Sequence, residues 1–380
     1  MAHRLLWKSM AQVTIHVPPR PYQARIENGL LSRTGALLAE LLPQSSKLFV
    51  VTAPPIRRRW GAKLLASLTS AGFKPQVLQI PDGELVKKLG TIEAMAERLV
   101  RLGADRKAVL IALGGGVVGD VTGLLASLYM RGVDLVQIPT TVLAQVDASV
   151  GGKTGVNLRA GKNLLGTYHH PRVVLIDPEV LHTLSDRAYR AGLYEALKCG
   201  IIGDLDLFLR FEQKRAQILK RDPVELEGLI AQSVKLKAEI VSADEQEGGL
   251  RRVLNLGHTI GHALETETGY RSLLHGEAVA WGLIAATNIA LTVGRTDSVT
   301  AGRIAEVVLS LGRLPELQVS ARKILARLQA DKKTQNGAVH FVLPREIGKV
   351  EIASDVPDKV VLDSVEELRR LSHGGWAWKK

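Results

Sequence analysis

Short apolar runs that alternate with helical patterns constrain the fold of this chain more than any other feature. Residues 108–113 form one such run, which ends in three consecutive glycines at 114–116. A continuous apolar run of this length is typical of a strand buried on both faces of a parallel sheet. Similar strands are expected at residues 47–52, 76–80, 135–138 and 173–176, with helices at residues 56–71 and 89–102. The alternation predicts an α/β fold with a Rossmann-like, doubly wound sheet.

The second half of the chain has a different residue pattern. After Asp177 and Pro178 the pattern is mostly helical, including residues 223–243, 254–267 and 277–292. A chain of 380 residues is too long for one ordinary core. Two domains are therefore expected, an α/β domain over residues 1–180 and a mostly α-helical domain over residues 181–380. Ligands of open α/β sheets bind at the carboxyl ends of the strands, and a second domain over that edge would form a cleft.

Composition excludes several classes of protein. No apolar run approaches the ~20 residues that a membrane span requires. The first residues lack the apolar stretch of a secretory signal. The single cysteine, Cys199, excludes an internal disulfide and fits the reducing cytoplasm.

The net charge of +12 is spread over short clusters, such as those at residues 57–59, 87–88 and 251–252. This dispersion favours cationic pockets for an anionic metabolite and a dinucleotide over a nucleic-acid surface. A non-catalytic nucleic-acid-binding protein is the alternative from a different class. It would bind DNA or RNA in a salt-sensitive manner, without taking up a metal or a dinucleotide.

Three of the ten histidines fall within 18 positions, at His258, His262 and His275. His258 and His262 are four residues apart in a helical pattern, so they share one helix face. Neutral imidazole is the commonest protein ligand of a divalent metal such as zinc, and the cluster indicates a metal site. Two surface or capping histidines are the alternative. Glu195 lies in an apolar helical segment, where it either completes the metal ligands or forms a surface ion pair with Lys198.

Glycine-rich and polar segments at the expected strand ends suit an anionic ligand. Residues 114–120 (GGGVVGD) precede a helix expected to begin near Val121. Their backbone amides could hold a pyrophosphate, with a tight turn as the alternative. Residues 81–87 (PDGELVK) offer carboxylates to ribose hydroxyls, or form a polar turn. Residues 147–163, rich in Gly, Lys, Asn and Thr, are interpreted as a long loop for phosphate and polyol recognition.

Taken together and in this order, these segments resemble the 3-dehydroquinate synthases, which are sugar-phosphate cyclases of the shikimate pathway. The resemblance covers residues 47–345 and rests on PDGExxK, GGGVVGD, IPTT, DASVGGKTGVN, GKN, GLxEAxK, KxxxVxxDExExGxR, NLGHTIGHALE, HGEAVA and DKK. The family implies an N-terminal NAD-binding domain, a C-terminal helical domain that holds a divalent metal, and a homodimer. Zinc is the expected metal, with cobalt as the second candidate.

By position, the resemblance implies that Glu195, His258 and His275 bind the metal. The residues implied to contact NAD are Asp82, Gly83, Glu84, Leu85, Val86, Lys87, Gly116, Val117, Val118, Gly119, Asp120, Thr140, Thr141, Lys153, Lys162, Val180, Leu181, His182 and Thr183. Those implied to hold the substrate and act in catalysis are Arg131, Asp147, Lys153, Asn163, Lys237, Glu247, Arg251, Asn255, His262 and Lys332. Arg131 resembles a residue that reaches the phosphate pocket of the partner subunit.

The implied reaction converts 3-deoxy-D-arabino-heptulosonate 7-phosphate, a seven-carbon acid phosphate, to 3-dehydroquinate and phosphate. An enzyme of this kind is a phosphorus–oxygen lyase. NAD transiently oxidises one carbon, phosphate is eliminated, the ketone is reduced again, and an intramolecular aldol addition closes the ring. NAD is regenerated in each cycle, and the protein supplies positioning and charge stabilisation.

The chain departs from the family at three places. Ala53 and the two prolines after it stand where an Asp or Asn commonly holds the adenosine ribose, which predicts weaker NAD binding. Tyr194 stands where a small residue is common, and Cys199 stands where an aromatic residue is common.

Two other enzymes are alternatives. One is a related cyclase acting on a neutral sugar phosphate such as glucose 6-phosphate or sedoheptulose 7-phosphate. The other is a metal-dependent polyol dehydrogenase, which would accumulate NADH on turnover.

Overall fold

The computed structural model describes residues 10–43, 47–159, 161–334 and 339–374. The chain divides into two compact units. The first comprises Met1–Thr183 and Leu226–Ser242, and the second comprises Leu184–Glu225 and Ala243–Lys380. Most of helix α9 (Pro223–Ala243) therefore belongs with the N-terminal residues rather than with the helices that precede and follow it in the chain.

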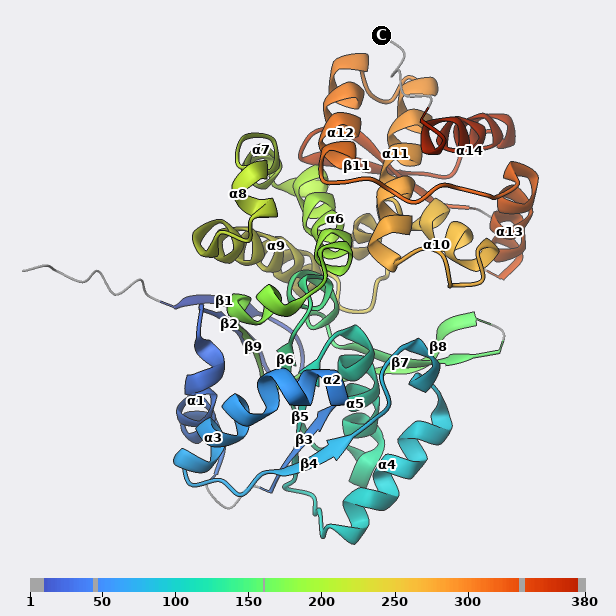
Figure 1. Ribbon diagram of the computed structural model, residues 1–380. Helices are drawn as coiled ribbons and strands as arrows, with labels where there is room; N and C mark the ends of the chain where they lie inside the picture. The colour runs from blue at the N-terminus through green and yellow to red at the C-terminus, as the bar shows by residue number, and fades with distance from the viewer. Residues whose placement is uncertain (1–9, 44–46, 160, 335–338, 375–380) are drawn as a thin grey trace, which may run out of the picture. The chain divides into compact units, whose positions relative to one another are not determined.

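The first unit contains a seven-stranded sheet in the order β1-β2-β9-β6-β5-β3-β4 (Figure 1). Its strands are β1 (Ala11–Ile15), β2 (Tyr22–Ile26), β3 (Leu48–Thr52), β4 (Gln76–Gln79), β5 (Val109–Gly114), β6 (Asp134–Pro139) and β9 (Val173–Ile176). Every neighbouring pair is parallel except β1 and β2. The five strands expected from the apolar runs are confirmed, and β1 and β2 extend the sheet at one edge.

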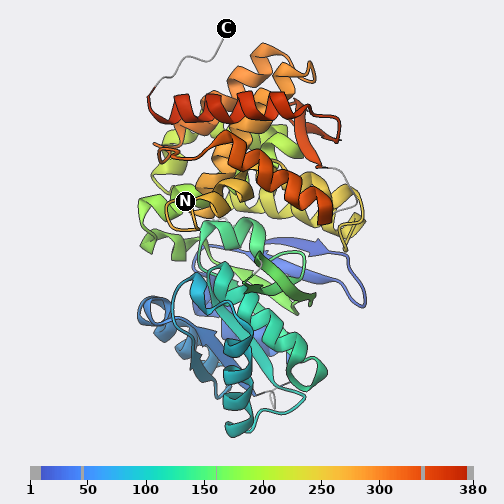
Figure 2. The ribbon, with the colours of Figure 1, turned by 90° about the vertical axis from the view of Figure 1, so that its right-hand side faces the viewer.

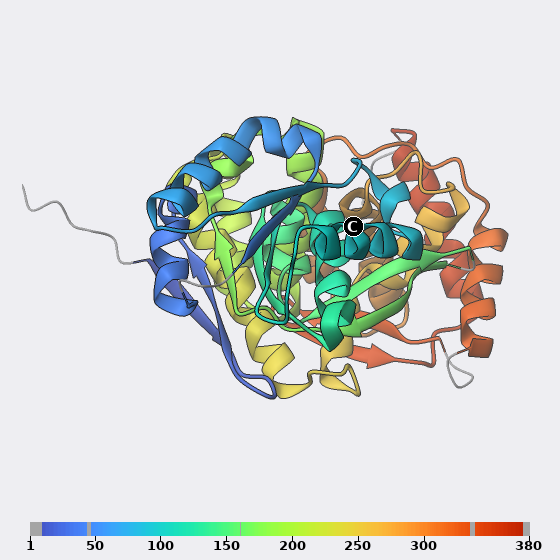
Figure 3. The ribbon, with the colours of Figure 1, turned by 90° about the horizontal axis from the view of Figure 1, so that it is seen from below.

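Helices cover both faces of this sheet, which confirms the doubly wound fold. On one side lie α1 (Thr34–Leu41) and α3 (Ala62–Ser70), and on the other lie α4 (Leu89–Arg101) and α5 (Gly116–Leu128) (Figures 1 and 3). A short α2 (Pro54–Ile56) and a π-helical turn (Arg57–Gly61) lead into α3. Leu99 of α4 and Leu125 of α5 are fully buried in one core with Phe49 of β3. The aliphatic strands thus bury both of their faces, as their lack of alternation predicts.

A two-stranded hairpin occupies most of the segment for which a long loop is predicted. β7 (Lys153–Leu158) pairs antiparallel with β8 (Gly161–Tyr168), after a π-helical turn at Ala144–Ala148. The loop prediction is wrong here because the glycines serve close strand pairing. A Cβ on Gly166 would lie 2.0 Å from the carbonyl oxygen of Thr154 on the opposite strand. A glycine inside a strand commonly marks such an approach of two backbones.

The second unit is mostly helical, as expected. Its helices are α6 (Asp186–Gly203), α7 (Leu205–Gln213), α8 (Arg215–Leu219), α10 (His258–Glu267), α11 (His275–Thr292), α12 (Ser298–Ser310), α13 (Ala321–Thr334) and α14 (Asp358–Ser372). One hairpin, β10 (Phe341–Glu346) with β11 (Lys349–Ala353), accompanies them. α14 packs against both α11 and α13 (Figure 2). None of the helices in the described part of the chain has the length and apolarity that a membrane span requires.

Three helix starts differ from the predictions, and each difference affects the candidate site. α5 begins at Gly116 instead of near Val121, and α11 begins at His275, two residues earlier than expected. The helix predicted over residues 254–267 is interrupted. A 3₁₀ turn, Leu250–Asn255, ends before Gly257, whose φ of +79° is left-handed, and α10 starts at His258. Glycine adopts this conformation without the steric cost that a side chain would add.

Candidate active site

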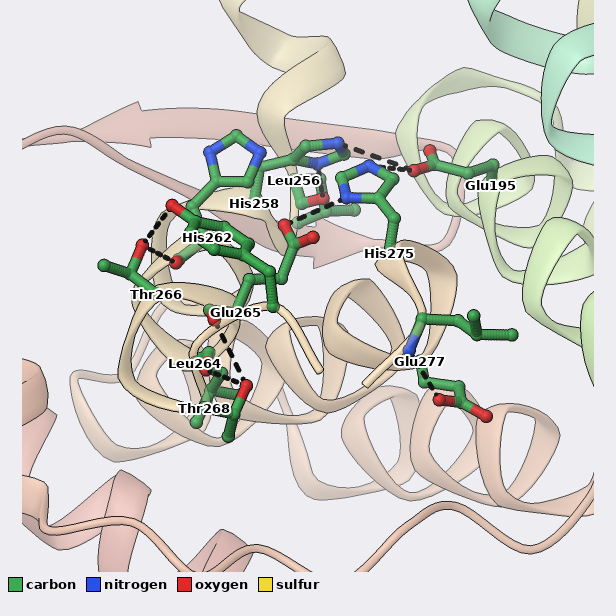
Figure 4. A network of polar contacts seen from close by, with 12 residues as sticks. Glu195, Leu256, His258, His262, Leu264, Glu265, Thr266, Thr268, His275 and Glu277 are labelled. Carbon is green, nitrogen blue, oxygen red and sulfur yellow. Dashed lines mark hydrogen bonds and ion pairs between the residues drawn. The ribbon is translucent and has the colours of Figure 1, made fainter. Parts of the chain in front are cut away.

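A candidate metal site lies in the second unit, where α6, α10 and α11 pack together (Figure 4). α6 contributes Glu195, α10 contributes His258 and His262, and α11 contributes its first residue, His275. The approach of α11 to α6 requires Gly276, because a Cβ at this position would lie 1.7 Å from the carbonyl oxygen of Ala191. Gly276 therefore allows the neighbouring His275 to come close to Glu195.

Glu195 lies beside two of the histidines (Figure 4). Its Oε1 is 3.5 Å from Nε2 of His258 and 3.2 Å from Nε2 of His275. His258, His262 and His275 each place one ring nitrogen so that the three atoms lie within 4.8 Å of one another. The structure thus brings together the three residues implied to bind the metal, with His262 next to them.

The donor atoms fit a divalent metal. Both carboxylate oxygens of the fully buried Glu195 have charged or polar partners, because Oε1 faces the two histidine Nε2 atoms and Oε2 lies 2.7 Å from Nζ of Lys198. Nδ1 of His258 lies 3.1 Å from the carbonyl oxygen of Leu256, and Nδ1 of His275 lies 3.1 Å from Oε2 of Glu265. When Nδ1–H is donated in this way, each ring presents the lone pair of Nε2 to the space beside Glu195. A carboxylate with imidazole nitrogens held by outer hydrogen bonds is a common zinc-binding arrangement.

Burial and charge determine the protonation of these ligands. Burial, reinforced by the charge of Lys198, lowers the pKa of His258 to about 3, so its ring is neutral at pH 7. Burial also lowers the pKa of His275, but hydrogen bonds to Glu195 and Glu265 outweigh it and raise this pKa to about 10. For Glu195, burial raises the pKa, while Lys198 and the two histidines bring it well below its usual range. Without a metal, the protonated His275 therefore faces the ionised Glu195.

Further residues with implied substrate roles lie in the segment that leads to α10. Nδ2 of Asn255 donates to Oε1 of Glu247 at 2.9 Å. Arg251 is 2% exposed, and its guanidinium donates to the carbonyl oxygen of Glu245. These contacts hold the polar side chains in a defined arrangement on the approach to His258. Lys332 lies in α13, but its side chain is outside the described residues.

A second polar cluster lies within the first unit and joins Lys237 to Asp147. Nζ of Lys237, on α9, is 2.7 Å from Oδ1 and 2.6 Å from the carbonyl oxygen of Asp147. Asp147 belongs to the π-helical turn that precedes the hairpin. Lys237 is 6% exposed, so its ammonium group is buried against Asp147 and does not lie at the surface. Lys153, at the start of β7, is exposed.

A third cluster surrounds Lys87, also in the first unit. Nζ of Lys87 lies 2.6 Å from Oδ2 of Asp120 and 2.5 Å from Oδ1 of Asn163. Burial raises the pKa of Asp120, and the charge of Lys87 opposes this effect. Asn157 extends the cluster by donating to Oε1 of Glu84 at 2.8 Å. Two residues implied to contact NAD thus adjoin Asn163, which is implied to hold the substrate.

The other residues with implied NAD roles occupy strand ends and helix starts of the first unit. Gly116–Asp120 form the start of α5, shortly after β5, and the first amides of a helix have no intrahelical acceptor, so they can bind an anion. Thr140 and Thr141 follow β6, and Oγ1 of Thr141 accepts a hydrogen bond from the amide of Ala144. The remaining residues fall into two groups: Asp82, Gly83, Leu85, Lys162, His182 and Thr183 reach the surface to different extents, whereas Val86, Val180 and Leu181 belong to the core.

Arg131 ends a 3₁₀ turn, Tyr129–Arg131, and has a left-handed φ of +66°. The residue before it, Met130, has a φ of +50°. Two consecutive side-chain-bearing residues in this region are unusual, because their Cβ atoms crowd the backbone. The turn holds Arg131 exposed at the surface of the first unit.

Two further residues contact the metal cluster, and the sequence pattern assigns neither of them to a buried position there. Nζ of Lys198 lies 2.7 Å from Oε2 of Glu195 and the residue is 1% exposed, so the ion pair considered as the alternative does form, but it is buried and not at the surface. Glu265 contacts His275 and is 3% exposed. Glu265 follows His258 by seven residues, and in a helix this spacing of about two turns places both side chains on the same face. It does not show that α11 packs against that face.

Comparisons with known proteins agree over nearly the whole chain. The family model described as 3-dehydroquinate synthase N-terminal matches residues 77–191, and the model described as 3-dehydroquinate synthase C-terminal matches residues 192–334. A 3-dehydroquinate synthase of Koribacter versatilis (strain Ellin345) is 50% identical over 366 residues, which cover 96% of this chain and 100% of the relative. One of Solibacter usitatus (strain Ellin6076) is 46% identical and covers 94% of this chain and 99% of the relative.

Solved structures of related cyclases share the fold. The 2-epi-5-epi-valiolone synthase of Streptomyces hygroscopicus subsp. jinggangensis 5008, solved with NAD+ and Zn2+ bound, matches with a TM-score of 0.84 and 31% identity. This match covers 92% of this chain and 97% of that one. A 2-deoxy-scyllo-inosose synthase, complexed with carbaglucose-6-phosphate, NAD+ and Co2+, matches with a TM-score of 0.83 and 25% identity, over 94% of this chain and 99% of that one.

Proposed function

Because the chain belongs to the 3-dehydroquinate synthase family, we propose that it converts 3-deoxy-D-arabino-heptulosonate 7-phosphate to 3-dehydroquinate and phosphate. The reaction class is that of a phosphorus–oxygen lyase. NAD and a divalent metal, zinc or cobalt, are the proposed cofactors, since the two related cyclase structures contain them.

The main support for a metal-dependent reaction is the environment of the Glu195 carboxylate. Glu195 is fully buried, and its Oε2 pairs with Nζ of Lys198, which leaves Oε1 to face the two histidines. Two imidazole Nε2 atoms lie within 3.5 Å of it, and the opposite nitrogen of each ring is already engaged. A buried carboxylate oxygen beside two imidazole nitrogens, each oriented by a contact of its other nitrogen, is a donor set that suits a divalent metal. We assign Glu195, His258 and His275 as the metal ligands.

The cofactors and the chain have separate tasks in the proposed reaction. When bound, NAD supplies a reversible hydride transfer and the metal makes a substrate hydroxyl more acidic. The residues proposed to bind NAD are Asp82, Gly83, Glu84, Leu85, Val86, Lys87, Gly116, Val117, Val118, Gly119, Asp120, Thr140, Thr141, Lys153, Lys162, Val180, Leu181, His182 and Thr183. The amides in the first turn of α5 would hold the pyrophosphate.

The substrate carries a carboxylate, several hydroxyls and a phosphate. Cationic and amide side chains suit these groups, because they donate charge-assisted hydrogen bonds. The residues proposed to bind the substrate and act on it are Arg131, Asp147, Lys153, Asn163, Lys237, Glu247, Arg251, Asn255, His262 and Lys332. Within this set, the Lys237–Asp147 pair and the Asn255–Glu247 pair are held by direct contacts, which reduces the freedom lost on binding.

A phosphate-release assay tests the proposal. The purified chain is incubated with the heptulosonate phosphate, NAD and Zn2+, and inorganic phosphate is measured with and without a chelator. Chelator-sensitive release, with formation of 3-dehydroquinate, is the expected result. Absence of release with Zn2+ and with Co2+ would contradict the proposed function.

The same assay separates the two alternative enzymes. A related cyclase would release phosphate from glucose 6-phosphate or form a cyclic product from sedoheptulose 7-phosphate, and would leave the heptulosonate phosphate unchanged. A metal-dependent polyol dehydrogenase would accumulate NADH, which absorbs near 340 nm. The proposed synthase returns its hydride within each cycle, so we expect no net change in NADH.

We also propose that the enzyme is a cytoplasmic homodimer in which Arg131 reaches the phosphate-binding residues of the partner subunit. The exposed position of Arg131 on its left-handed turn is compatible with this role. Mixing an Arg131→Ala chain with a chain inactivated at Lys237 tests it. If Arg131 acts across the interface, hybrid dimers regain one intact site and hence part of the activity.

A further inference from the structure

Glu265 is a buried carboxylate that the proposed reaction does not use. It lies on α10, seven residues after His258, and is 3% exposed. Its Oε2 is 3.1 Å from Nδ1 of His275, the first residue of α11 (Figure 4). The contact therefore links the two helices that carry the three histidines.

The two proposed histidine ligands have different outer partners. Nδ1 of His258 faces the neutral carbonyl oxygen of Leu256, whereas Nδ1 of His275 faces a carboxylate. Both partners fix the tautomer that leaves Nε2 free. A carboxylate also increases the electron density on the ring, which strengthens its bond to a metal.

The charges around the site explain why one partner is a carboxylate. Lys198 is 1% exposed, and its ammonium nitrogen lies 2.7 Å from Oε2 of Glu195. A buried cation so close to a ligand opposes the binding of a second cation. Glu265 adds one buried negative charge on the other side of His275, which offsets the charge of Lys198.

We propose that Glu265 is a positioning residue: it orients His275 through Nδ1 and supplies the negative charge that makes the site bind a divalent metal tightly. The inference rests on the proposed assignment of Glu195, His258 and His275 as metal ligands. Glu265 itself touches neither the metal nor the substrate in this assignment.

The test compares Glu265→Gln with the wild type and with Glu267→Gln. Glutamine keeps the shape and one acceptor but removes the charge. Glu267 lies on the same helix and pairs with Lys323 and Arg327 of α13, so its variant controls for the loss of a glutamate from α10. Zn2+ affinity is measured by competition with a chromophoric chelator, which does not depend on activity. We expect Glu265→Gln to raise the Kd for Zn2+ by about 10- to 100-fold and Glu267→Gln to leave it unchanged.

Absorption spectra of the Co2+-loaded proteins provide a second readout. A change in the ligand field of His275 should shift the visible bands in Glu265→Gln and leave them unaltered in Glu267→Gln. An unchanged Kd and an unchanged spectrum in a folded Glu265→Gln protein would overturn the inference. If that variant does not fold, Glu265→Asp is used. It keeps the charge at a greater distance from His275, so we expect a smaller but measurable loss of affinity, and wild-type affinity would overturn the inference.

These outcomes are distinct from a failure of the proposed function. If the wild type bound no Zn2+, the ligand assignment itself would be wrong. If the wild type bound Zn2+ and both glutamine variants matched it, only the role of Glu265 would be refuted. A loss of affinity together with normal thermal stability of the metal-free variant would support positioning over a general effect on folding.

Discussion

Lys198 forms an ion pair with Glu195 one turn away on α6, with 2.7 Å between Nζ and Oε2 and almost no exposure of either side chain. Burying both charges removes their hydration, and this desolvation penalty is offset only when the geometry is good and further polar partners are present. Oε1 of the same carboxylate faces two histidine Nε2 atoms. The arrangement places a buried cation and a proposed metal site on opposite oxygens of one carboxylate.

Replacing Lys198 by methionine should destabilise the metal-free protein. The substitution leaves the Glu195 carboxylate buried without its nearest cation, and the loss of one partner of a buried pair costs about 3–5 kcal/mol. Zn2+ should restore more stability to Lys198→Met than to the wild type, because the metal then supplies the missing positive charge. Thermal unfolding with and without Zn2+ measures both effects. Lys323→Met, at an exposed ion pair, is the control and should change neither. An unaltered metal-free protein would show that Lys198 does not stabilise Glu195.

His258→Ala should abolish metal binding, because it removes one of the three proposed protein ligands. The metal content of the protein after dialysis, measured by atomic emission, is the direct test. His373→Ala removes an exposed histidine at the end of α14 and should retain the metal. Full metal occupancy and activity in His258→Ala would refute the ligand assignment.

Zn2+ binding should release about one proton near neutral pH. In the metal-free protein the pKa of His275 is about 10, so the ring is protonated at pH 7, whereas the pKa of His258 is about 3 and its ring is already neutral. The metal must displace the proton from His275. Apparent affinity should therefore rise with pH below about 10. Calorimetric titrations in buffers of different ionisation enthalpy count the released protons, and identical heats in all buffers would contradict this prediction.

Gly276→Ala should weaken both stability and metal binding. Its Cβ would lie 1.7 Å from the carbonyl oxygen of Ala191, so α11 must move away from α6, and His275 moves with it. Overpacking of this kind costs about 1–3 kcal/mol. Gly90→Ala in α4 is the matched control, because a Cβ there meets nothing within 4 Å. The control should be neutral or slightly stabilising. Denaturant unfolding and Zn2+ titration of both variants decide the matter, and equal results for the two would count against close packing at Gly276.

Lys237→Met should reduce the rate of phosphate release by about 100-fold or more if its ammonium group stabilises charge during the reaction. Lys235→Met, two residues away on the exposed face of α9, should keep wild-type activity. Lys237 also holds Asp147, so thermal unfolding is measured in parallel to detect a structural effect. Normal turnover in a folded Lys237→Met protein would remove this residue from the proposed catalytic set.

The sequence predicts much of this molecule because many of its features are local. Continuous apolar runs of strand length that end at turn residues, such as residues 108–113, are typical of buried strands, and five of the seven strands of the main sheet follow from such runs. The spacing of His258 and His262 likewise predicts one shared helix face. The change to a mostly helical pattern after residue 178 follows from periodicity alone.

Other features depend on which distant segments pack together, and periodicity does not contain that information. The hairpin of β7 and β8 forms because Gly155 and Gly166 lie opposite each other, whereas their composition alone suggests a loop. Lys198 and Lys237 belong to helices on which a charged residue is normally solvated, yet both are buried against acidic partners.

The histidine cluster shows the division most directly. The sequence by itself determined which residue types are available and that two of them lie one turn apart on a helix. Only the tertiary structure decided that α6, α10 and α11 approach closely enough for Glu195 to face His258 and His275, and for Glu265 to reach the far side of His275. The physical reason is that helix faces are set by backbone periodicity, while the contacts between faces depend on the packing of residues far apart in the chain, here through the missing side chain of Gly276.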